Sequence, residues 1–158
     1  MNITILAVGT VKEPFYRQAV NEYCKRLRPY ATLRIIEIPE QARPEKASEK
    51  ETEQALEKEA ERIRKALPKE SCVVSLCIEG KQQDSVSFAT HLDHWAVEGG
   101  SAITFIIGGS DGLAPSIKKL GKQLSFSRMT FPHTLMRVIL LEQIYRGFRI
   151  LHHEPYHK

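Results

Sequence analysis

Three glycines close the most apolar stretch of the sequence. In "FIIGGSDGL", Gly108 and Gly109 follow a run of large apolar side chains, and Gly112 comes shortly afterwards. Glycines at the end of a buried strand let a ligand approach the main chain closely. The spacing fits neither the G-x-G-x-x-G of dinucleotide sites nor a phosphate loop that ends in Gly-Lys-Ser/Thr. Taken alone, the glycines fit a tight turn as well as a ligand site.

The C-terminal "HHEPYHK" gathers rings, hydrogen-bond donors and positive charge. Aromatic and imidazole rings stack on unpaired bases, and cations contact phosphates. These properties predict an RNA-contact tail made of His152, His153, Tyr156, His157 and Lys158. His153 and His157 are spaced like metal ligands on a helix, but Pro155 prevents a regular helix there. RNA contact is therefore favoured, and no metal is expected.

Positive charge is concentrated in the same part of the chain. The 158 residues carry a formal net charge of +4. Residues 114–158 hold eight lysines and arginines against two glutamates, together with four of the six histidines. This asymmetry favours a polyanionic partner, although a positive net charge also occurs in ordinary soluble proteins.

The bulk composition is that of a soluble globular protein. Hydrophobic residues make up 42% and charged residues 27%, and no apolar run approaches the ~20 residues that cross a bilayer. The cysteines form no CxxC pair, and the first residues resemble a strand more than a secretion signal. We therefore expect a cytoplasmic protein without a membrane partner, folded as one domain over residues 1–158.

Apolar runs alternate with helical patterns along the chain. Strands are expected at Ile3–Gly9, Thr32–Pro39, Cys72–Ile78, 101–109 and Leu124–Ser127. Helices are expected at Glu13–Arg28, from about Ser48 to Leu67, from Asp84 or Ser85 past Trp95, at Pro115–Leu120, and from about Pro132 to Leu151. Strands that are apolar along their whole length favour an α/β fold with a mostly parallel sheet flanked by helices. The polar stretch Gln41–Thr52 is expected to be a mobile loop.

The last helix is apolar on nearly all sides. Its apolar residues are Leu135, Met136, Val138, Ile139, Leu140 and Leu141. A helix of this kind needs cover on more than one face. We expect one side to pack on the sheet and another on a second copy of the chain, in a two-fold homodimer. A central helix of a monomer is the alternative.

Several motifs together resemble a known family. "AVGTVKEPF", "FIIGGSDGL", "SFSRMTFPHTLMRVILLEQIYR" and the terminal "HHEPYHK" occur in this order over essentially the whole chain. Their combination closely resembles the bacterial large-subunit (23S) ribosomal RNA pseudouridine N3-methyltransferases, which are small SPOUT-class enzymes. The resemblance implies a C-terminal trefoil knot, an exception to the rule that chains do not knot.

The resemblance also implies a cofactor and a substrate. S-adenosylmethionine would lie in the knot beside the dimer interface, and its methyl group would go to N3 of a pseudouridine in ribosomal RNA of assembled ribosomes. Carried over by position, the cofactor-binding residues are Leu76, Gly108, Phe126, Ser127, Arg128, Met129, Thr130 and Phe131. The glycines would then approach a cofactor that carries no phosphate.

Methyl transfer to N3 requires the loss of a proton from the base. Nearby cations stabilise the resulting charge, so Arg137, Arg146 and His133 are the candidate catalytic residues. Structural alternatives remain: Arg137 pairs with Glu142 or bridges subunits, or His133 only shapes the start of the helix. Two other functions also stay open, a knotted tRNA methyltransferase and a non-catalytic ribosome-binding factor.

Overall fold

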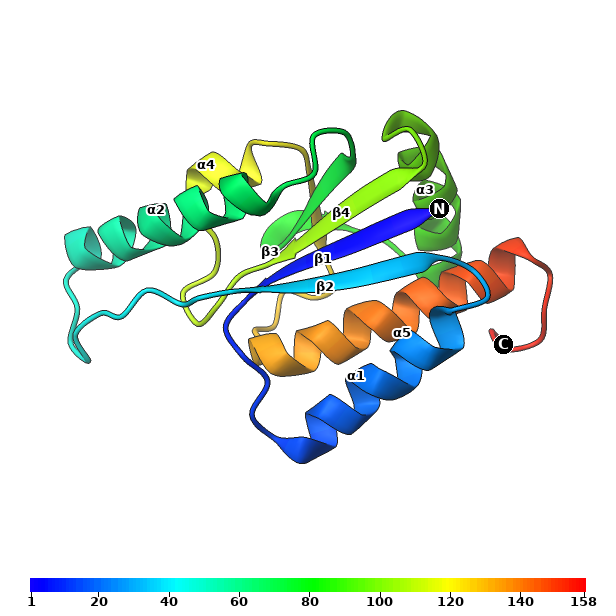
Figure 1. Ribbon diagram of the computed structural model, residues 1–158, viewed down its shortest axis with the longest axis horizontal. Coiled ribbons are helices and arrows are strands. Elements are labelled where there is room, and N and C mark those ends of the chain that lie inside the picture. Colours follow the sequence, from blue (N-terminus) through cyan, green and yellow to red (C-terminus); the bar gives the residue numbers. More distant parts are fainter.

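The protein is built around a five-stranded parallel sheet. A computed structural model describes residues 1–158, and its strands are β1 (Asn2–Val8), β2 (Thr32–Ile38), β3 (Cys72–Gln82), β4 (Ala102–Ile107) and β5 (Lys122–Ser125). Their order in the sheet is β2-β1-β4-β3-β5, and every neighbouring pair is parallel. The predicted α/β class with a parallel sheet flanked by helices is confirmed (Figure 1).

Helices cover both faces of this sheet. α1 (Pro14–Leu27), α3 (Ser85–Glu98) and α5 (His133–Leu151) pack against one face, while α2 (Glu49–Ala66) and α4 (Pro115–Lys118) pack against the other (Figure 1). Successive side chains of a strand point to opposite faces. In β1, Ile5 therefore enters the core beneath α1, α3 and α5, and its neighbour Leu6 enters the core beneath α2 and α4.

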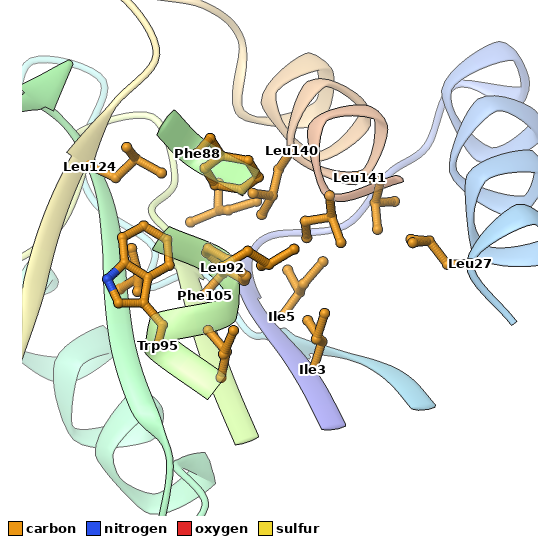
Figure 2. Close-up of a cluster of buried hydrophobic side chains, with 14 of the residues drawn as sticks. Ile3, Ile5, Leu27, Phe88, Leu92, Trp95, Phe105, Leu124, Leu140 and Leu141 are labelled. Atoms are coloured by element: carbon orange, nitrogen blue, oxygen red, sulfur yellow. The ribbon is translucent and has the colours of Figure 1, made fainter. Parts of the chain in front are cut away.

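The larger core joins α3 and α5 to the middle of the sheet. Phe105 of β4 is fully buried and lies next to Phe88 of α3, with ring centroids 6.3 Å apart. Figure 2 shows Phe88 and Leu140 approaching one another from the two helices, with Leu92 nearby. Removing a side chain from such a core costs about 2–5 kcal/mol, so this layer fixes where α5 lies.

The last helix is covered more completely by its own chain than its composition suggests. α5 packs against both α1 and α3, and Leu140 and Leu141 are fully buried between them. Leu135 and Ile139 are half-buried. The side of α5 that carries these two residues is therefore covered less completely by the chain itself. No helix of the structure combines the length and the apolar character needed to cross a membrane.

Capping residues fix the N-terminal ends of helices α2 and α3. Ser48 caps α2 by accepting from the Glu51 amide at 3.1 Å, and the Glu51 side chain accepts from the Ser48 amide in return. This reciprocal pair satisfies two backbone donors that lack helical partners. Asp84 caps α3 with a single hydrogen bond, accepting from the Ser87 amide at 2.7 Å. Both starts agree with the sequence-based prediction.

The predicted loop at Gln41–Thr52 is partly wrong. Its last residues, from Glu49, form the first turn of α2. Its first residues are held in place, because the Gln41 amide and the Arg43 guanidinium both donate to Glu59 of α2 at 2.8 Å. No local pattern predicts this attachment, because Gln41 and Arg43 lie 18 and 16 positions from Glu59 along the chain.

β3 is longer than predicted and is interrupted. It pairs with β5 at Val74–Leu76 and again at Lys81–Gln82, with an irregularity between Leu76 and Lys81. Residues 77–80 therefore bulge away from regular pairing, and the polar "EGKQ" sequence conceals the second paired segment. The bulge matters for the site, because it forms one wall of the pocket described next.

Candidate functional site

A pocket of about 800 Å³ lies at the carboxyl ends of β3, β4 and β5. This edge of a parallel α/β sheet is where such folds usually bind ligands. Three segments form its walls: the β3 bulge, the glycine loop that follows β4, and the loop between β5 and α5. The start of α5, at His133 and Met136, closes the remaining side.

The glycine loop needs glycine for steric reasons. A Cβ at Gly108 would lie 2.5 Å from the backbone carbon and oxygen of Gly112. Gly112 has a φ of +78°, which other residues rarely adopt, and its amide donates to Gly109 at 3.1 Å. The backbone therefore folds back on itself at the pocket wall. The sequence left open whether the glycines form a tight turn or a ligand site, and in the structure they form a tight turn that also lines the pocket.

The loop between β5 and α5 is fastened by its own serines. Ser125 donates to the carbonyl of Ser127 at 2.9 Å, and the Ser127 hydroxyl accepts from the Met129 amide at 3.0 Å. Phe126 packs against Phe88 of the core, whereas Met129 is 72% exposed at the rim. The loop thus has an anchored base and an accessible tip.

The structure brings the predicted cofactor residues together. Seven of the eight line the pocket, namely Leu76, Gly108, Phe126, Ser127, Met129, Thr130 and Phe131. Arg128 is not among the lining residues. The fold thus brings residues from the ends of three separate strands into one pocket.

Several lining residues were missed by the sequence analysis. Cys77, Ile78 and Glu79 of the β3 bulge and Lys118 of α4 all face the pocket. Lys118 forms an ion pair with Glu79, and this hydrogen bond lowers the pKa of the Glu79 carboxyl. The pair ties the bulge to α4. No sequence signal marks it, because the two residues are far apart along the chain and each occurs in a polar stretch.

His133 is the one predicted catalytic residue that lines this pocket. Its ring packs against the end of β1, so that a Cβ at Gly9 would lie 3.0 Å from the ring carbon Cε1. Its Nδ1 atom is buried and has no hydrogen-bond partner within the chain. A buried nitrogen of this kind is usually satisfied by an ordered water.

Arg137 lies one turn further along α5 and is buried. Its guanidinium donates to Glu37 of β2 at 2.8 Å and to the Gly9 carbonyl at 3.4 Å. The suggested pairing of Arg137 with Glu142 is wrong, since Glu142 is bound by Arg146 at 2.6 Å instead. Arg137 thus fastens the start of α5 to the ends of β1 and β2, beside the pocket but outside its lining.

The C-terminal tail folds back on the end of α5. Tyr156 donates to Glu142 at 3.0 Å, its ring meets Tyr145 edge-on at 4.9 Å, and Arg146 lies over it. Burial, followed by the hydrogen bond to Glu142, raises the pKa of Tyr156 to about 12. Arg149 pairs with Glu154 and donates to the Pro155 carbonyl. The tail is therefore structured rather than loosely extended.

Among the predicted RNA-contact residues, Tyr156 is engaged within the chain and the four others are exposed, namely His152, His153, His157 and Lys158. His157 also lines a second hollow of about 700 Å³, between α3, α5 and the β5–α5 loop. The two hollows share Leu124–Ser127 and Phe131. No group of three or more His, Cys, Asp or Glu side chains is arranged to hold a metal ion.

A parallel sheet with a pocket formed by loops at its carboxyl edge is the usual ligand-binding arrangement of α/β proteins. The family described as "Predicted SPOUT methyltransferase" matches residues 1–157, and the chain belongs to this family.

Similar proteins agree with this assignment. Proteins named ribosomal RNA large subunit methyltransferase H from Exiguobacterium sibiricum and Clostridium acetobutylicum are each 49% identical to this chain, over 100% of both sequences. A protein from Methanococcus maripaludis that carries the same name provisionally is 54% identical over the same extent. The resemblance found in the sequence is confirmed at the level of the family.

Solved structures of low sequence identity share the fold. A probable methylase family protein from Haemophilus influenzae is 14% identical and superposes with a TM-score of 0.56, covering 99% of this chain and 70% of that one. TrmJ from Z. mobilis is 11% identical with a TM-score of 0.56, covering 100% of this chain and 73% of that one.

Proposed function

We propose that the protein transfers a methyl group from S-adenosylmethionine to N3 of a pseudouridine in large-subunit ribosomal RNA. The observation that carries this proposal is the pocket, where seven of the eight residues expected to bind the cofactor converge. The names of the relatives that match over their full length support ribosomal RNA as the substrate. The whole chain acts as one domain, in the cytoplasm.

The residues present fit S-adenosylmethionine. The walls combine apolar side chains, such as Leu76 and Ile107, with a backbone left uncovered by glycine. A side chain at Gly108 would collide with the Gly112 backbone in this wall, so glycine keeps the turn closed. Because the cofactor has no phosphate, the absence of both phosphate motifs agrees with its binding here. When bound, it supplies an activated methyl group on a sulfonium.

The chain's own residues must orient the base and deal with its proton. A bond forms between N3 and the methyl carbon as the bond between sulfur and that carbon breaks, and the N3 proton leaves to a base or to water. His133 lines the pocket, so its ring is placed to receive or relay this proton. Arg137 positions His133 by holding the start of α5 against the Gly9 carbonyl. Arg146 contacts His157 of the tail, which lines the second hollow.

The remaining parts of the proposal concern assembly and substrate. A two-fold homodimer would cover the half-buried side of α5, and the C-terminal part would be threaded as a trefoil knot. The exposed residues His152, His153, His157 and Lys158, together with Tyr156, would contact the RNA of an assembled ribosome. These five residues offer little surface for RNA, which favours a target that the ribosome has already shaped.

One experiment tests cofactor, reaction and substrate together. Labelled methyl groups of S-adenosylmethionine are offered with ribosomes that lack the modification, and the labelled nucleoside is identified by mass spectrometry. We expect label in N3-methylpseudouridine. Bulk tRNA and protein-free ribosomal RNA serve as competing substrates. Label in tRNA would move the activity there, and a protein that binds ribosomes but no S-adenosylmethionine would be a non-catalytic factor.

A further inference from the structure

One arginine connects helix α2 to the glycine loop of the pocket. Arg43 lies in the segment that follows β2, and its side chain is only 14% exposed. One guanidinium nitrogen donates to Glu59 of α2 at 2.8 Å, and another donates to Asp111 of the glycine loop at 2.5 Å. Arg43 thus bridges two carboxylates, one on α2 and one in the glycine loop.

The ion pair between Arg43 and Glu59 is rigid rather than a flexible surface contact, because Glu59 is buried. Its side chain is 2% exposed, and a single carboxylate oxygen accepts from both Arg43 and the Gln41 amide at 2.8 Å. A buried carboxylate needs such partners, because leaving it unpaired is strongly destabilising. The planar fork of Arg43 is therefore oriented by a buried group before it reaches Asp111.

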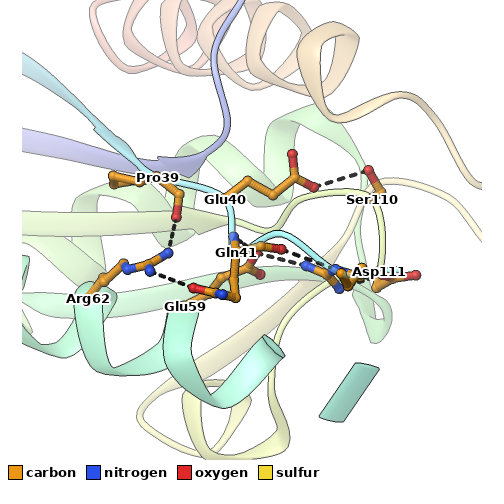
Figure 3. Close-up of polar contacts among 8 residues, drawn as sticks. Pro39, Glu40, Gln41, Glu59, Arg62, Ser110 and Asp111 are labelled. Atoms are coloured by element: carbon orange, nitrogen blue, oxygen red, sulfur yellow. Dashed lines mark hydrogen bonds and ion pairs between the residues drawn. The ribbon is translucent and has the colours of Figure 1, made fainter. Parts of the chain in front are cut away.

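The glycine loop has few other attachments of this kind. Gly108, Gly109 and Gly112 offer no side chains for packing, and the turn is closed internally by the Gly112 amide. Outside the turn, Ser110 donates to Glu40 at 3.4 Å, a weaker contact from the same segment 39–43. Figure 3 shows Glu40 and Ser110 pointing toward one another, with Glu59 and Asp111 on the other side of the segment.

We propose that Arg43 is a positioning residue for the cofactor pocket: by linking buried Glu59 to Asp111, it holds the glycine loop in the shape that binds S-adenosylmethionine. The identity of the ligand rests on the function proposed above, whereas the link itself does not. Ser110 and Asp111 line the pocket, so a loop that shifts alters the wall directly. Arg43 is not a lining residue and acts through Asp111.

Arg62 provides a matched control. It also extends from α2 to the segment 39–43, donating to the Pro39 carbonyl at 2.8 Å and to the Gln41 side chain at 2.6 Å. These are its only hydrogen bonds, and neither reaches the glycine loop. Arg62→Ala therefore loosens the segment from the same helix while leaving the contact between Arg43 and Asp111 in place.

The first measurement is hydrogen exchange of the full-length protein without cofactor. Arg43→Ala is expected to speed exchange in peptides that cover residues 108–113, and Arg62→Ala is expected to leave these peptides unchanged. Equal exchange in Arg43→Ala and the unmodified protein would overturn the proposal. Because Arg43→Ala leaves Glu59 buried without its cation, the double variant Arg43→Ala/Glu59→Gln repeats the test with no unpaired charge.

The second measurement is the Kd for S-adenosylmethionine by calorimetry. Arg43→Ala is expected to raise Kd about tenfold, the size of a lost charge-assisted hydrogen bond, and Arg43→Lys should restore part of the loss. In an Asp111→Ala background, Arg43→Ala should cost no further affinity, because the contact is already gone. The same tenfold loss in both backgrounds would refute action through Asp111. An unmodified protein that does not bind S-adenosylmethionine would refute the proposed function, while the exchange result would still decide the role of Arg43.

Discussion

The steric demand of the glycine loop makes Gly108→Ala the sharpest test of the pocket. The added methyl group would lie 2.5 Å from the carbonyl carbon and oxygen of Gly112 and 2.9 Å from its Cα. These atoms are backbone, so they cannot rotate away as a side chain would. The turn must open by about 1 Å to restore ordinary contact distances, and this displacement moves one wall of the pocket.

The expected loss of ligand affinity follows from that strain. Forcing a methyl group into a filled space costs about 1–3 kcal/mol, and about 2 kcal/mol corresponds to a thirtyfold rise in Kd for S-adenosylmethionine. Calorimetry measures the Kd, and thermal unfolding measures the stability of the same variant. The expected pattern is a large loss of affinity with the fold retained.

Gly100→Ala is the matched control for this prediction. Gly100 lies in the turn between α3 and β4 with a φ of +63°, and an added Cβ would meet nothing within 4 Å. Alanine there stores about 1 kcal/mol of backbone strain without touching the pocket. Its Kd should match that of the unmodified protein. A Gly108→Ala variant that binds as tightly as Gly100→Ala would show that the glycine loop does not form the binding site.

Three further outcomes test the core, the tail and the chemistry. Leu140→Ala, which empties a fully buried site, should lower the free energy of unfolding by about 2–5 kcal/mol in denaturant titrations; a loss below 1 kcal/mol would contradict the packing of α5. Because the pKa of Tyr156 is raised to about 12, the tail contact is fully present below the ordinary tyrosine value near 10 and is lost as pH rises through about 12. Phenolate absorbance should therefore show a late-titrating component that Tyr156→Phe removes and Glu142→Gln shifts to lower pH; an unchanged titration in Tyr156→Phe would assign the late component elsewhere. His133→Gln should slow methyl transfer at saturating cofactor about a hundredfold if the ring handles the N3 proton, and a loss below threefold would exclude that role.

Apolar continuity along the strands was sufficient to predict the parallel sheet. Runs such as Ile3–Val8 and Ala102–Ile107 contain almost no polar residues, which is expected only for strands covered on both faces. The caps at Ser48 and Asp84 were also predictable, because capping depends on neighbouring residues. Local patterns thus determined the element order and most element boundaries.

Contacts between distant residues account for what the sequence did not reveal. Arg137 has its partner in Glu37, which is 100 positions away, and a charge pattern along the helix suggested Glu142 instead. The second paired segment of β3 depends on backbone hydrogen bonds to β5, which do not require apolar side chains. The link from Glu59 through Arg43 to Asp111 joins three segments, and the sequence of no single segment predicts it.

Because α5 is the last element of the chain, the fold can be completed only at the end of synthesis. β1 and β2 can pair early, but Asn2 of β1 finds its other neighbour only when Ala102 has been added. The larger core remains incomplete until Leu140, Leu141 and Ile144 have been added. At ~5–20 residues per second, roughly ten seconds of translation separate the first strand from the last helix. During that time the nascent sheet exposes an unpaired edge and a bare apolar face, and such surfaces are prone to aggregation until α5 covers them.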